Sequence, residues 1–194
     1  MKRLCQYLQD TKDNGLVFNT SKKLVVDCYD DADFAGLWGH ENSQDPISAR
    51  SRTLFVVTFS DLPLLWVLKL QTEISLYTLH YEYAALSHSV RELFTLKSLI
   101  KKVIENSGID SEKLKFVSSC TVYEDNNGAI VVTTSPRMTP TSNYIDVKYH
   151  WFRQNVGKES VIWKIKSENQ KADIFAKGLK GQIFVSIRKL LCGW

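Results

Sequence analysis

The chain has 194 residues, of which 44% are apolar and 24% charged, and its net charge is +4. These values are ordinary for a globular protein, and the length suffices for one domain with a hydrophobic core. No apolar run is long enough to span a membrane, and the start of the chain lacks the apolar stretch of a secretory signal. The four cysteines form no Cys-x-x-Cys pair, which argues against a zinc site and favours free thiols.

The charge is unevenly distributed along the chain. Residues 24–46 contain six acidic residues and no Lys or Arg, whereas residues 143–194 contain ten basic and four acidic residues. A solvated face explains the basic half on its own. An acidic pocket beside a basic surface, however, is what metal-dependent chemistry on a polyanion requires, so the combination points to nucleic acid.

The first half of the chain predicts one helix, several strands and then a long helix. The predicted order is a helix at 2–10, strands at 16–18, 24–29, 53–59 and 64–70, and a helix at 80–105. Gly108 ends the long helix. A long polar connection at 36–51 separates the second and third strands.

The second half alternates strands with helices. The pattern predicts strands at 114–123 and 161–165, and helices at 126–133, 146–156, 170–177 and 182–191. A loop punctuated by Pro136 and Pro140 precedes the second of these helices. Strands followed by alternating helices and strands are typical of an α/β protein with a mixed sheet and helices on its faces.

Four acidic residues each lie in a short motif of mixed polarity. They are Asp31 in DCYDDADFAG, Glu82 in HYEYAAL, Asp125 in VYEDNNGAI and Asp173 in NQKADIFAKGL. The pattern predicts them, in this order, on a strand, a helix, a strand end and a helix. Carboxylate oxygens are the ligands that hard divalent cations prefer, so four of them in one pocket could hold two such ions.

Each of these residues also has an ordinary structural explanation. Asp31 could be a turn residue, and Glu82 could be a partner of the helix dipole. Asp125 or Asn126 could cap the following helix. Asp173 could be an exposed helical residue paired with Lys177 four residues later. Of the neighbouring acids, Asp30 and Asp33 are expected to be exposed, and Glu124 is expected to point away from Asp125.

A series of blocks in the same order resembles the ribonuclease H domain of copia-type retrotransposon polyproteins. DADFAG resembles the DADWAG of that family, and YEDNNGAI, YIDVKYHWFR and NQKADIFAKGL resemble its later blocks. LKLQTEISLYTLHYEYAALSHSVREL resembles its SKLQTEIALSTTEAEYIALSHAVREL region. The opening MKRLCQYLQDTKDNGLVF resembles the tail of the preceding reverse transcriptase.

The resemblance implies a ribonuclease-H-like fold, with a mixed five-stranded sheet and helices on both faces. It divides the chain into a reverse transcriptase tail at 1–20 and a ribonuclease-H-like domain at 21–194. It further implies an intracellular enzyme, in a cytoplasmic virus-like particle or the nucleus, that cleaves the RNA strand of RNA–DNA hybrids during reverse transcription. Its partners would be the hybrid and the reverse transcriptase of the same polyprotein. The residues implied as catalytic and as ligands of two Mg²⁺ ions, for which Mn²⁺ can substitute, are Asp31, Glu82, Asp125 and Asp173.

Other residues are candidates for contacts with the hybrid. Those expected to bind the 2′-hydroxyl groups or the phosphates are Asn126, Asn127, Lys97, Lys101, Lys102, Lys148 and Arg153.

The chain departs from the family pattern at Leu54, where the family has Gly, and at His80, where it has Glu. These departures leave open a catalytically weak remnant that binds nucleic acid or a polymerase partner. An integrase of the same fold is a weaker alternative.

Overall fold

The computed structural model describes residues 2–17, 24–36, 44–108, 120–135, 145 and 147–194. In chain order, the regular elements are α1 (Lys2–Asp10), β1 (Val26–Asp33), β2 (Arg52–Phe59), β3 (Leu62–Leu70), α2 (Thr78–Asn106), β4 (Cys120–Glu124), α3 (Asn127–Thr134), β5 (Ser160–Lys164) and α4 (Gly181–Cys192). Short 3-10 helices join them, among them η1 (Pro46–Ala49), η3 (Val147–Tyr149), η4 (Trp151–Asn155), η5 (Ser167–Asn169) and η6 (Lys171–Phe175).

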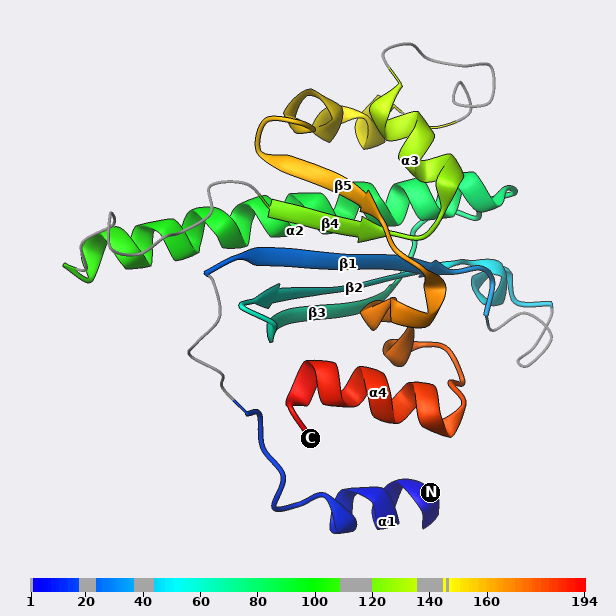
Figure 1. The fold of residues 1–194 in the computed structure, drawn as a ribbon. Coiled ribbons are helices and arrows are strands. Elements are labelled where there is room, and N and C mark those ends of the chain that lie inside the picture. Colours follow the sequence, from blue (N-terminus) through cyan, green and yellow to red (C-terminus); the bar gives the residue numbers. More distant parts are fainter. Residues whose placement is uncertain (1, 18–23, 37–43, 109–119, 136–144, 146) are drawn as a thin grey trace.

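The strands form one mixed sheet in the order β3-β2-β1-β4-β5. The pairs β1–β2 and β2–β3 are antiparallel, whereas β4 and β5 run parallel to β1. A meander of three strands followed by two parallel strands is the ribonuclease-H-like arrangement that the sequence predicted. Because β1 is the central strand, it lies between β2 and β4 and contacts α2 and η6 (Figure 1).

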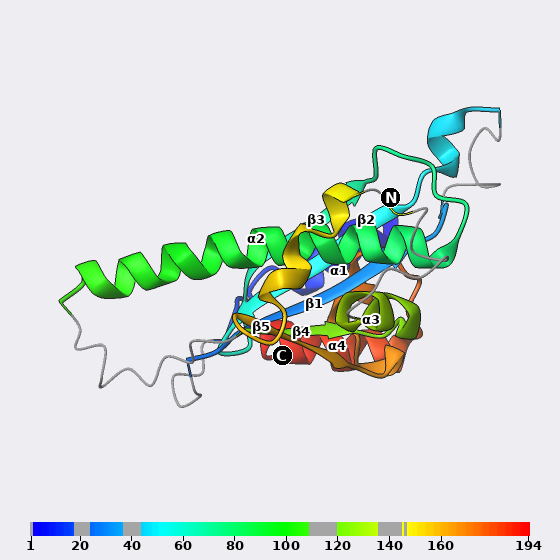
Figure 2. The same ribbon diagram turned by 90° about the horizontal axis from the view of Figure 1, so that it is seen from above.

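Helices cover both faces of the sheet (Figures 1 and 2). On one face, α2 and α3 bury alternate residues of the strands, including Cys28, Phe55 and Val122. On the other face, η6 and α4 pack on Tyr29 and Val56. This division follows from the alternation of side chains along a strand. Consequently, neighbouring residues of β1 face two different sets of helices.

The helix α1 lies beyond α4, on the side of α4 that faces away from the sheet (Figure 1). It has no buried residue, and Tyr7 packs edge-on against Phe184 of α4 at a centroid distance of 6.1 Å. The segment after it is attached to the C-terminus, because the Val17 backbone N–H donates to the Cys192 carbonyl. The domain boundary at residue 20 stays a prediction.

Several boundaries differ from the sequence predictions. The strand β1 continues to Asp33, past the predicted end at residue 29. The helices predicted at 146–156 and 170–177 are short 3-10 helices, at Val147–Tyr149, Trp151–Asn155 and Lys171–Phe175, and residue 146 lies outside the described residues. Residues 16 and 17 belong to no strand. The remainder of that predicted strand, residues 114–119 of another, and most of the predicted loop with Pro136 and Pro140 lie outside the described residues.

Candidate active site

The register of β1 and β4 brings Asp31 and Asp125 to the same level of the sheet. Tyr29 pairs with Tyr123 across these parallel strands, and their rings stack at a centroid distance of 4.6 Å. Asp31 and Asp125 each lie two residues beyond this pair. Adjacent strands are about 4.8 Å apart, so both aspartates lie at the carboxyl edge of the sheet, the usual place for a site in an open α/β fold.

Asp30 and Glu124 each lie one residue beyond the paired tyrosines. Both are completely buried, on the face that α2 covers. The expectation that Asp30 is exposed is therefore wrong. Asp33 is only half-buried, and its carboxylate lies 3.6 Å from the Arg52 guanidinium. Glu124 points away from Asp125, as predicted, and its Oε1 accepts a hydrogen bond from the Asn126 backbone at 2.8 Å.

Glu82 approaches the sheet edge from α2, where it lies in the second turn of the helix. It is 7% exposed, and its Oε2 atom has no hydrogen-bond partner among the described residues. Burial raises the pKa of Glu82 to about 10, and the negative charges of Glu124, Asp31 and Asp125 add to this effect. Of these three charges, that of Glu124 has the largest effect on Glu82.

Asp173 approaches from the opposite face, on η6. Gln170 holds this segment against the sheet: its buried Nε2 donates to the Asp30 carbonyl at 2.7 Å. Its Oε1 accepts from the Ala172 backbone at 3.4 Å, which caps η6. Asp173 is 6% exposed as a result, so it is a buried residue and not the exposed one that a purely structural role would give.

The Lys177 ammonium group lies between Asp31 and Asp173. Its Nζ atom is 2.9 Å from Asp31 Oδ2 and 2.7 Å from Asp173 Oδ1. The pairing of Asp173 with Lys177 matches the i, i+4 pair anticipated from the sequence, but its contact with Asp31 was not anticipated. Three side chains from two distant parts of the chain therefore form one charged cluster.

Burial and charge act in opposite directions on this cluster. Burial raises the pKa of Asp31 to about 7, although the adjacent Lys177 opposes the shift. Burial alone would lower the pKa of Lys177, but the carboxylates of Asp31 and Asp173 outweigh it and raise that pKa. Lys177 therefore stays charged at neutral pH, and its charge offsets part of the cost of burying the Asp31 carboxylate.

Asp125 is half-buried and accepts a hydrogen bond from Ser167 Oγ at 2.6 Å. The cap of α3 is Asn126, whose Oδ1 accepts from the Ala129 backbone at 3.1 Å. Asp125 is thus not used as a helix cap. Because Asn126 is engaged in capping, the exposed Asn127 on the first turn of α3 is the freer of the two predicted contacts with nucleic acid.

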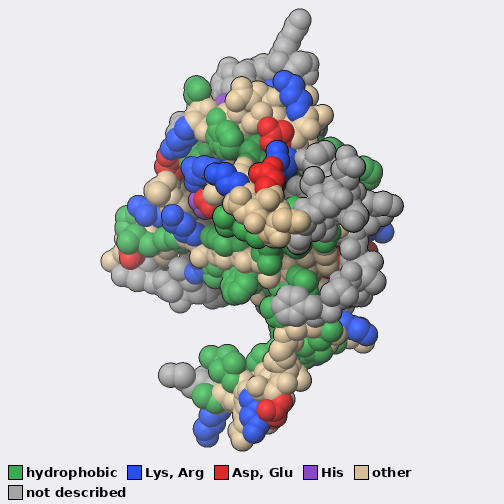
Figure 3. All heavy atoms as spheres, turned by 90° about the vertical axis from the view of Figure 1, so that its left-hand side faces the viewer, with side chains coloured by type: hydrophobic (Ala, Val, Ile, Leu, Met, Phe, Trp, Pro, Cys, Tyr) green, Lys and Arg blue, Asp and Glu red, His purple; other side chains and the backbone are tan. Residues whose placement is uncertain are grey.

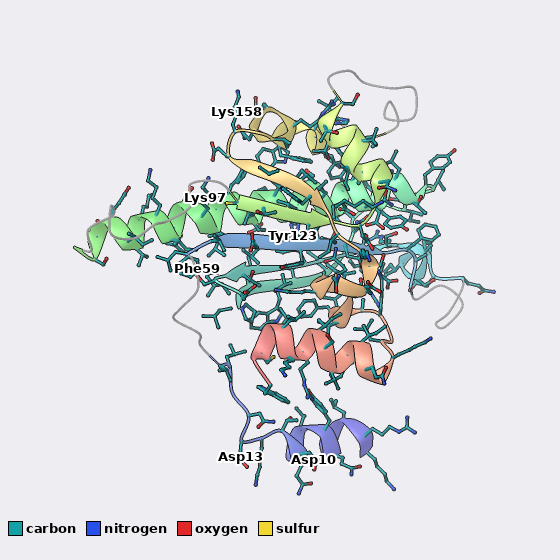
Figure 4. The ribbon with its side chains drawn as sticks, viewed as in Figure 1. Asp10, Asp13, Phe59, Lys97, Tyr123 and Lys158 are labelled. Carbon is teal, nitrogen blue, oxygen red and sulfur yellow. The ribbon has the colours of Figure 1, made fainter. Side chains whose placement is uncertain are left out.

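The predicted phosphate-binding residues are spread along the molecule. Lys97, Lys101 and Lys102 lie 15 to 20 residues after Glu82 on α2. At 1.5 Å per residue, that is about 22 to 30 Å along the helix axis. Figure 4 labels Lys97 on the half of α2 remote from the carboxyl end of β1. Lys and Arg side chains on that side of the molecule are scattered among acidic ones (Figure 3).

Four of the five predicted phosphate-binding Lys and Arg residues also have partners in the protein. Lys97 lies 3.6 Å from Glu159, and Lys101 lies 3.8 Å from Glu105. The Arg153 guanidinium donates to the Ser135 carbonyl. Lys148 pairs with Glu73 and lines a groove of about 270 Å³ over α2. The other cationic or aromatic residues that line this groove are Lys69, His88, Arg91, Tyr149 and Trp151.

The donor set fits a divalent cation in kind, because it offers carboxylate oxygens, including the unpartnered Oε2 of Glu82. The present arrangement does not yet form a metal cage. Within the described part of the chain, no three His, Cys, Asp or Glu side chains are placed so that they could hold one ion. Asp31 and Asp173 are turned to Lys177, whereas Glu82 lies on the side of Asp30 and Glu124.

Comparison with known proteins gives relatives of one kind. The chain is 28% identical over 192 residues, 98% of its length, to the retrovirus-related Pol polyprotein from transposon TNT 1-94 of Nicotiana tabacum. It is 24% and 23% identical over 95% of its length to those from transposons RE2 and RE1 of Arabidopsis thaliana. All three of these relatives are retrotransposon Pol polyproteins. The chain spans only 12 to 13% of the length of these relatives.

No family model and no solved structure matches the chain. The similarity bears out the expected kinship with retrotransposon Pol polyproteins. Among the helices that the structure describes, none is long and apolar enough to cross a membrane.

Proposed function

We propose that this chain is the ribonuclease H segment of a retrotransposon polyprotein and cleaves the RNA strand of RNA–DNA hybrids in a divalent-metal-dependent reaction. The observation that supports this most strongly is the arrangement of four acidic residues, on four separate elements, around the carboxyl end of the central strands of a ribonuclease-H-like sheet. Asp31 and Asp125 each lie two residues beyond the paired Tyr29 and Tyr123. Asp173 shares the Lys177 ammonium with Asp31, and Glu82 lies on α2 over the other face of the sheet.

The residues that would hold Mg²⁺ are Asp31, Glu82, Asp125 and Asp173. Once bound, a pair of ions would activate water and stabilise the leaving oxygen of a phosphodiester. Burial raises the pKa values of the Asp31 and Glu82 carboxyl groups. Without metal, protonation of such groups reduces the repulsion between like charges in one pocket. The carboxyl groups must lose these protons, and the Lys177 ammonium must move away, before the carboxylates can bind cations.

The substrate would be held chiefly through its backbone. The groove over α2 offers Lys69, Arg91 and Lys148 for phosphates, with aromatic walls beside them. Asn127 at the start of α3 could reach a 2′-hydroxyl, the group that distinguishes RNA from DNA. Binding should therefore depend little on base sequence and should weaken as salt increases.

A second function is supported by the absence of a formed metal cage among the described residues. In this case the chain would keep the fold and bind nucleic acid or a polymerase partner without cleavage. A single experiment separates the two functions: incubation of the chain with an end-labelled RNA–DNA hybrid in Mg²⁺, in Mn²⁺ and in EDTA.

A nuclease should produce RNA fragments with 5′-phosphate and 3′-hydroxyl ends in either metal and none in EDTA. The matched control is Asp31→Asn, which removes one ligand and should be inactive in the same preparation. Retention of the hybrid without any cleavage, in both metals, would establish the binding function and rule out the nuclease.

A further inference from the structure

The side chain of Lys177 covers the two buried carboxylates from the solvent side. The side chains of Asp31 and Asp173 are 2% and 8% exposed, whereas that of Lys177 is 38% exposed. Lys177 follows η6, and its backbone N–H donates to the Asp173 carbonyl at 2.9 Å. The backbone position is therefore fixed, but the flexible part of the side chain has access to water.

The contacts of Lys177 are those that a divalent ion would need. Its ammonium lies within 3 Å of one oxygen of Asp31 and one of Asp173. It supplies the positive charge that these two carboxylates otherwise lack, since they would repel each other. An ammonium and a metal ion cannot occupy the same space between two carboxylate oxygens, so their binding must be mutually exclusive.

We propose that Lys177 is a built-in cation that competes with divalent metal for Asp31 and Asp173. The inference rests on the proposed metal site and adds a residue that sets its affinity. In the metal-free protein, Lys177 holds the two carboxylates in place. For metal to bind, the Lys177 side chain must rotate into solvent, towards which it is already partly exposed. Breaking the ion pairs of Lys177 costs free energy, so metal binds more weakly than it would without this lysine.

Two features distinguish this role from an ordinary surface ion pair. Exposed pairs contribute little to stability because water screens both charges. Here both carboxylates are buried, and the lysine is their solvent-side neighbour, so removal of the ammonium leaves two uncompensated buried acids. The same removal frees the oxygens for a metal ion. One substitution should therefore weaken the metal-free protein and strengthen metal binding.

The test is Lys177→Met, which keeps the length of the side chain and removes its charge. Mg²⁺ affinity is measured by isothermal titration calorimetry on the full chain without nucleic acid, and melting temperature is measured in EDTA and in Mg²⁺. The control is Lys180→Met, an exposed lysine three residues later that has the same effect on net charge. Lys177→Arg keeps the positive charge and should retain the competition.

We expect Lys177→Met to bind Mg²⁺ at least ten-fold more tightly than the parent, to melt at a lower temperature in EDTA and to gain more from Mg²⁺. Lys180→Met and Lys177→Arg should bind Mg²⁺ no more tightly than the parent. If Lys177→Met does not fold in EDTA, Lys177→Gln, which retains a hydrogen-bond donor, serves for the titration. Unchanged or weaker Mg²⁺ binding by the uncharged variant would overturn the proposal.

This experiment is independent of cleavage. If the parent cleaves hybrids but Lys177→Met binds Mg²⁺ no better, the proposed function stands and the competition is wrong. If no variant cleaves but Lys177→Met binds Mg²⁺ more tightly than the parent, the competition stands and the nuclease activity is wrong.

Discussion

At the scale of single residues, the most important feature is that successive side chains of β1 face opposite sides of the sheet. Asp30 and Asp31 are adjacent and both are buried, but they face opposite sides of the sheet. Asp30 joins Glu124 beneath α2, whereas Asp31 meets Asp173 and Lys177 beneath η6. The chain therefore places two acidic groups, with different partners, on either side of one strand.

The first prediction concerns Asp125. Asp125→Asn should abolish Mg²⁺-dependent cleavage, because the substitution preserves size and hydrogen bonding to Ser167 but removes a charge that cations require. Hybrid binding should remain within about two-fold, because phosphate contacts come mainly from Lys and Arg. Cleavage is measured on a labelled hybrid and binding by fluorescence anisotropy in Ca²⁺. A variant that cleaves as fast as the parent would remove Asp125 from the ligand set.

The second prediction is an unusual dependence of stability on pH. Burial raises the pKa of Asp31 to about 7 and that of Glu82 to about 10, whereas unfolded carboxyl groups titrate near pH 4. Between pH 5 and 8 the folded chain thus binds more protons than the unfolded chain. The free energy of unfolding should accordingly fall as pH rises, in EDTA.

Urea denaturation at pH 5, 6, 7 and 8 measures this slope. Glu82→Gln should make it less steep by up to about 1.4 kcal/mol per pH unit, the effect of one proton. Glu105→Gln, on an exposed part of the same helix, is the control and should leave the slope unchanged. If parent and Glu82→Gln show the same slope, Glu82 does not retain its proton in the folded state.

At the scale of elements, η6 depends on one buried amide. Gln170 is completely buried and donates to the Asp30 carbonyl in β1. The segment that carries Asp173 and Lys177 is a short 3-10 helix, which has poor internal hydrogen bonding and needs such anchors. The positions of Asp173 and Lys177 therefore depend on a buried amide that is not one of the four acidic residues.

The third prediction follows from this anchor. Gln170→Ala should lower the free energy of unfolding by about 1–3 kcal/mol, because it leaves buried backbone groups without partners. It should also reduce cleavage more than hybrid binding, since Asp173 loses its support. Chemical denaturation and the cleavage assay provide the two measurements. Asn169→Ala, at the exposed preceding residue, should change neither, and equal effects of both substitutions would contradict the role of Gln170.

The elements that the sequence predicted correctly are those with a clear apolar pattern. The apolar alternation of β2 and the long apolar face of α2 were sufficient to predict both elements. The end of β1 was missed because DDAD looks like a turn, and burial of adjacent acids contradicts the hydrophobic pattern on which such predictions depend. The segments at 151–155 and 171–175 were predicted only as helices, because helical spacing over so few residues does not distinguish a 3-10 helix from an α-helix.

The site was predictable only in part for a related reason. The family blocks suggested four carboxylates, and the i, i+4 spacing suggested the pair of Asp173 and Lys177. The contact of Lys177 with Asp31 joins residues 146 positions apart and depends on how η6 packs against β1. Nothing in the local sequence specifies that packing. For the same reason, the buried pair of Asp30 and Glu124 emerges only from the register of two strands.

At the scale of the whole molecule, the N-terminal helix is loosely attached. α1 has no buried residue, and the edge-on contact of Tyr7 with Phe184 is worth about 1 kcal/mol at most. The segment around Val17 is held more firmly, by the carbonyl of Cys192 and by close packing on Gly193.

The fourth prediction tests this difference with two truncations. Removal of residues 1–10 should change the free energy of unfolding by no more than about 1 kcal/mol, because it exposes no core residue. Removal of residues 1–17 should cost measurably more, because it also breaks the contacts with the C-terminus. Urea denaturation of the three chains checks the order, and a large loss from the shorter truncation would show that α1 is part of the core.

The outer strand β3 has a consequence for handling the protein. It forms one edge of the sheet, and Leu64, Trp66 and Leu68 are 44%, 57% and 49% exposed on one of its faces. Pro63 and Lys69, near its two ends, are the kind of residue that discourages strand addition, but the five residues between them are all apolar. An unpaired, apolar strand edge is a template for aggregation. Concentrated preparations should therefore be prone to edge-to-edge assembly. Charged substitutions at Trp66 or Leu68 offer the direct means of keeping the chain monomeric.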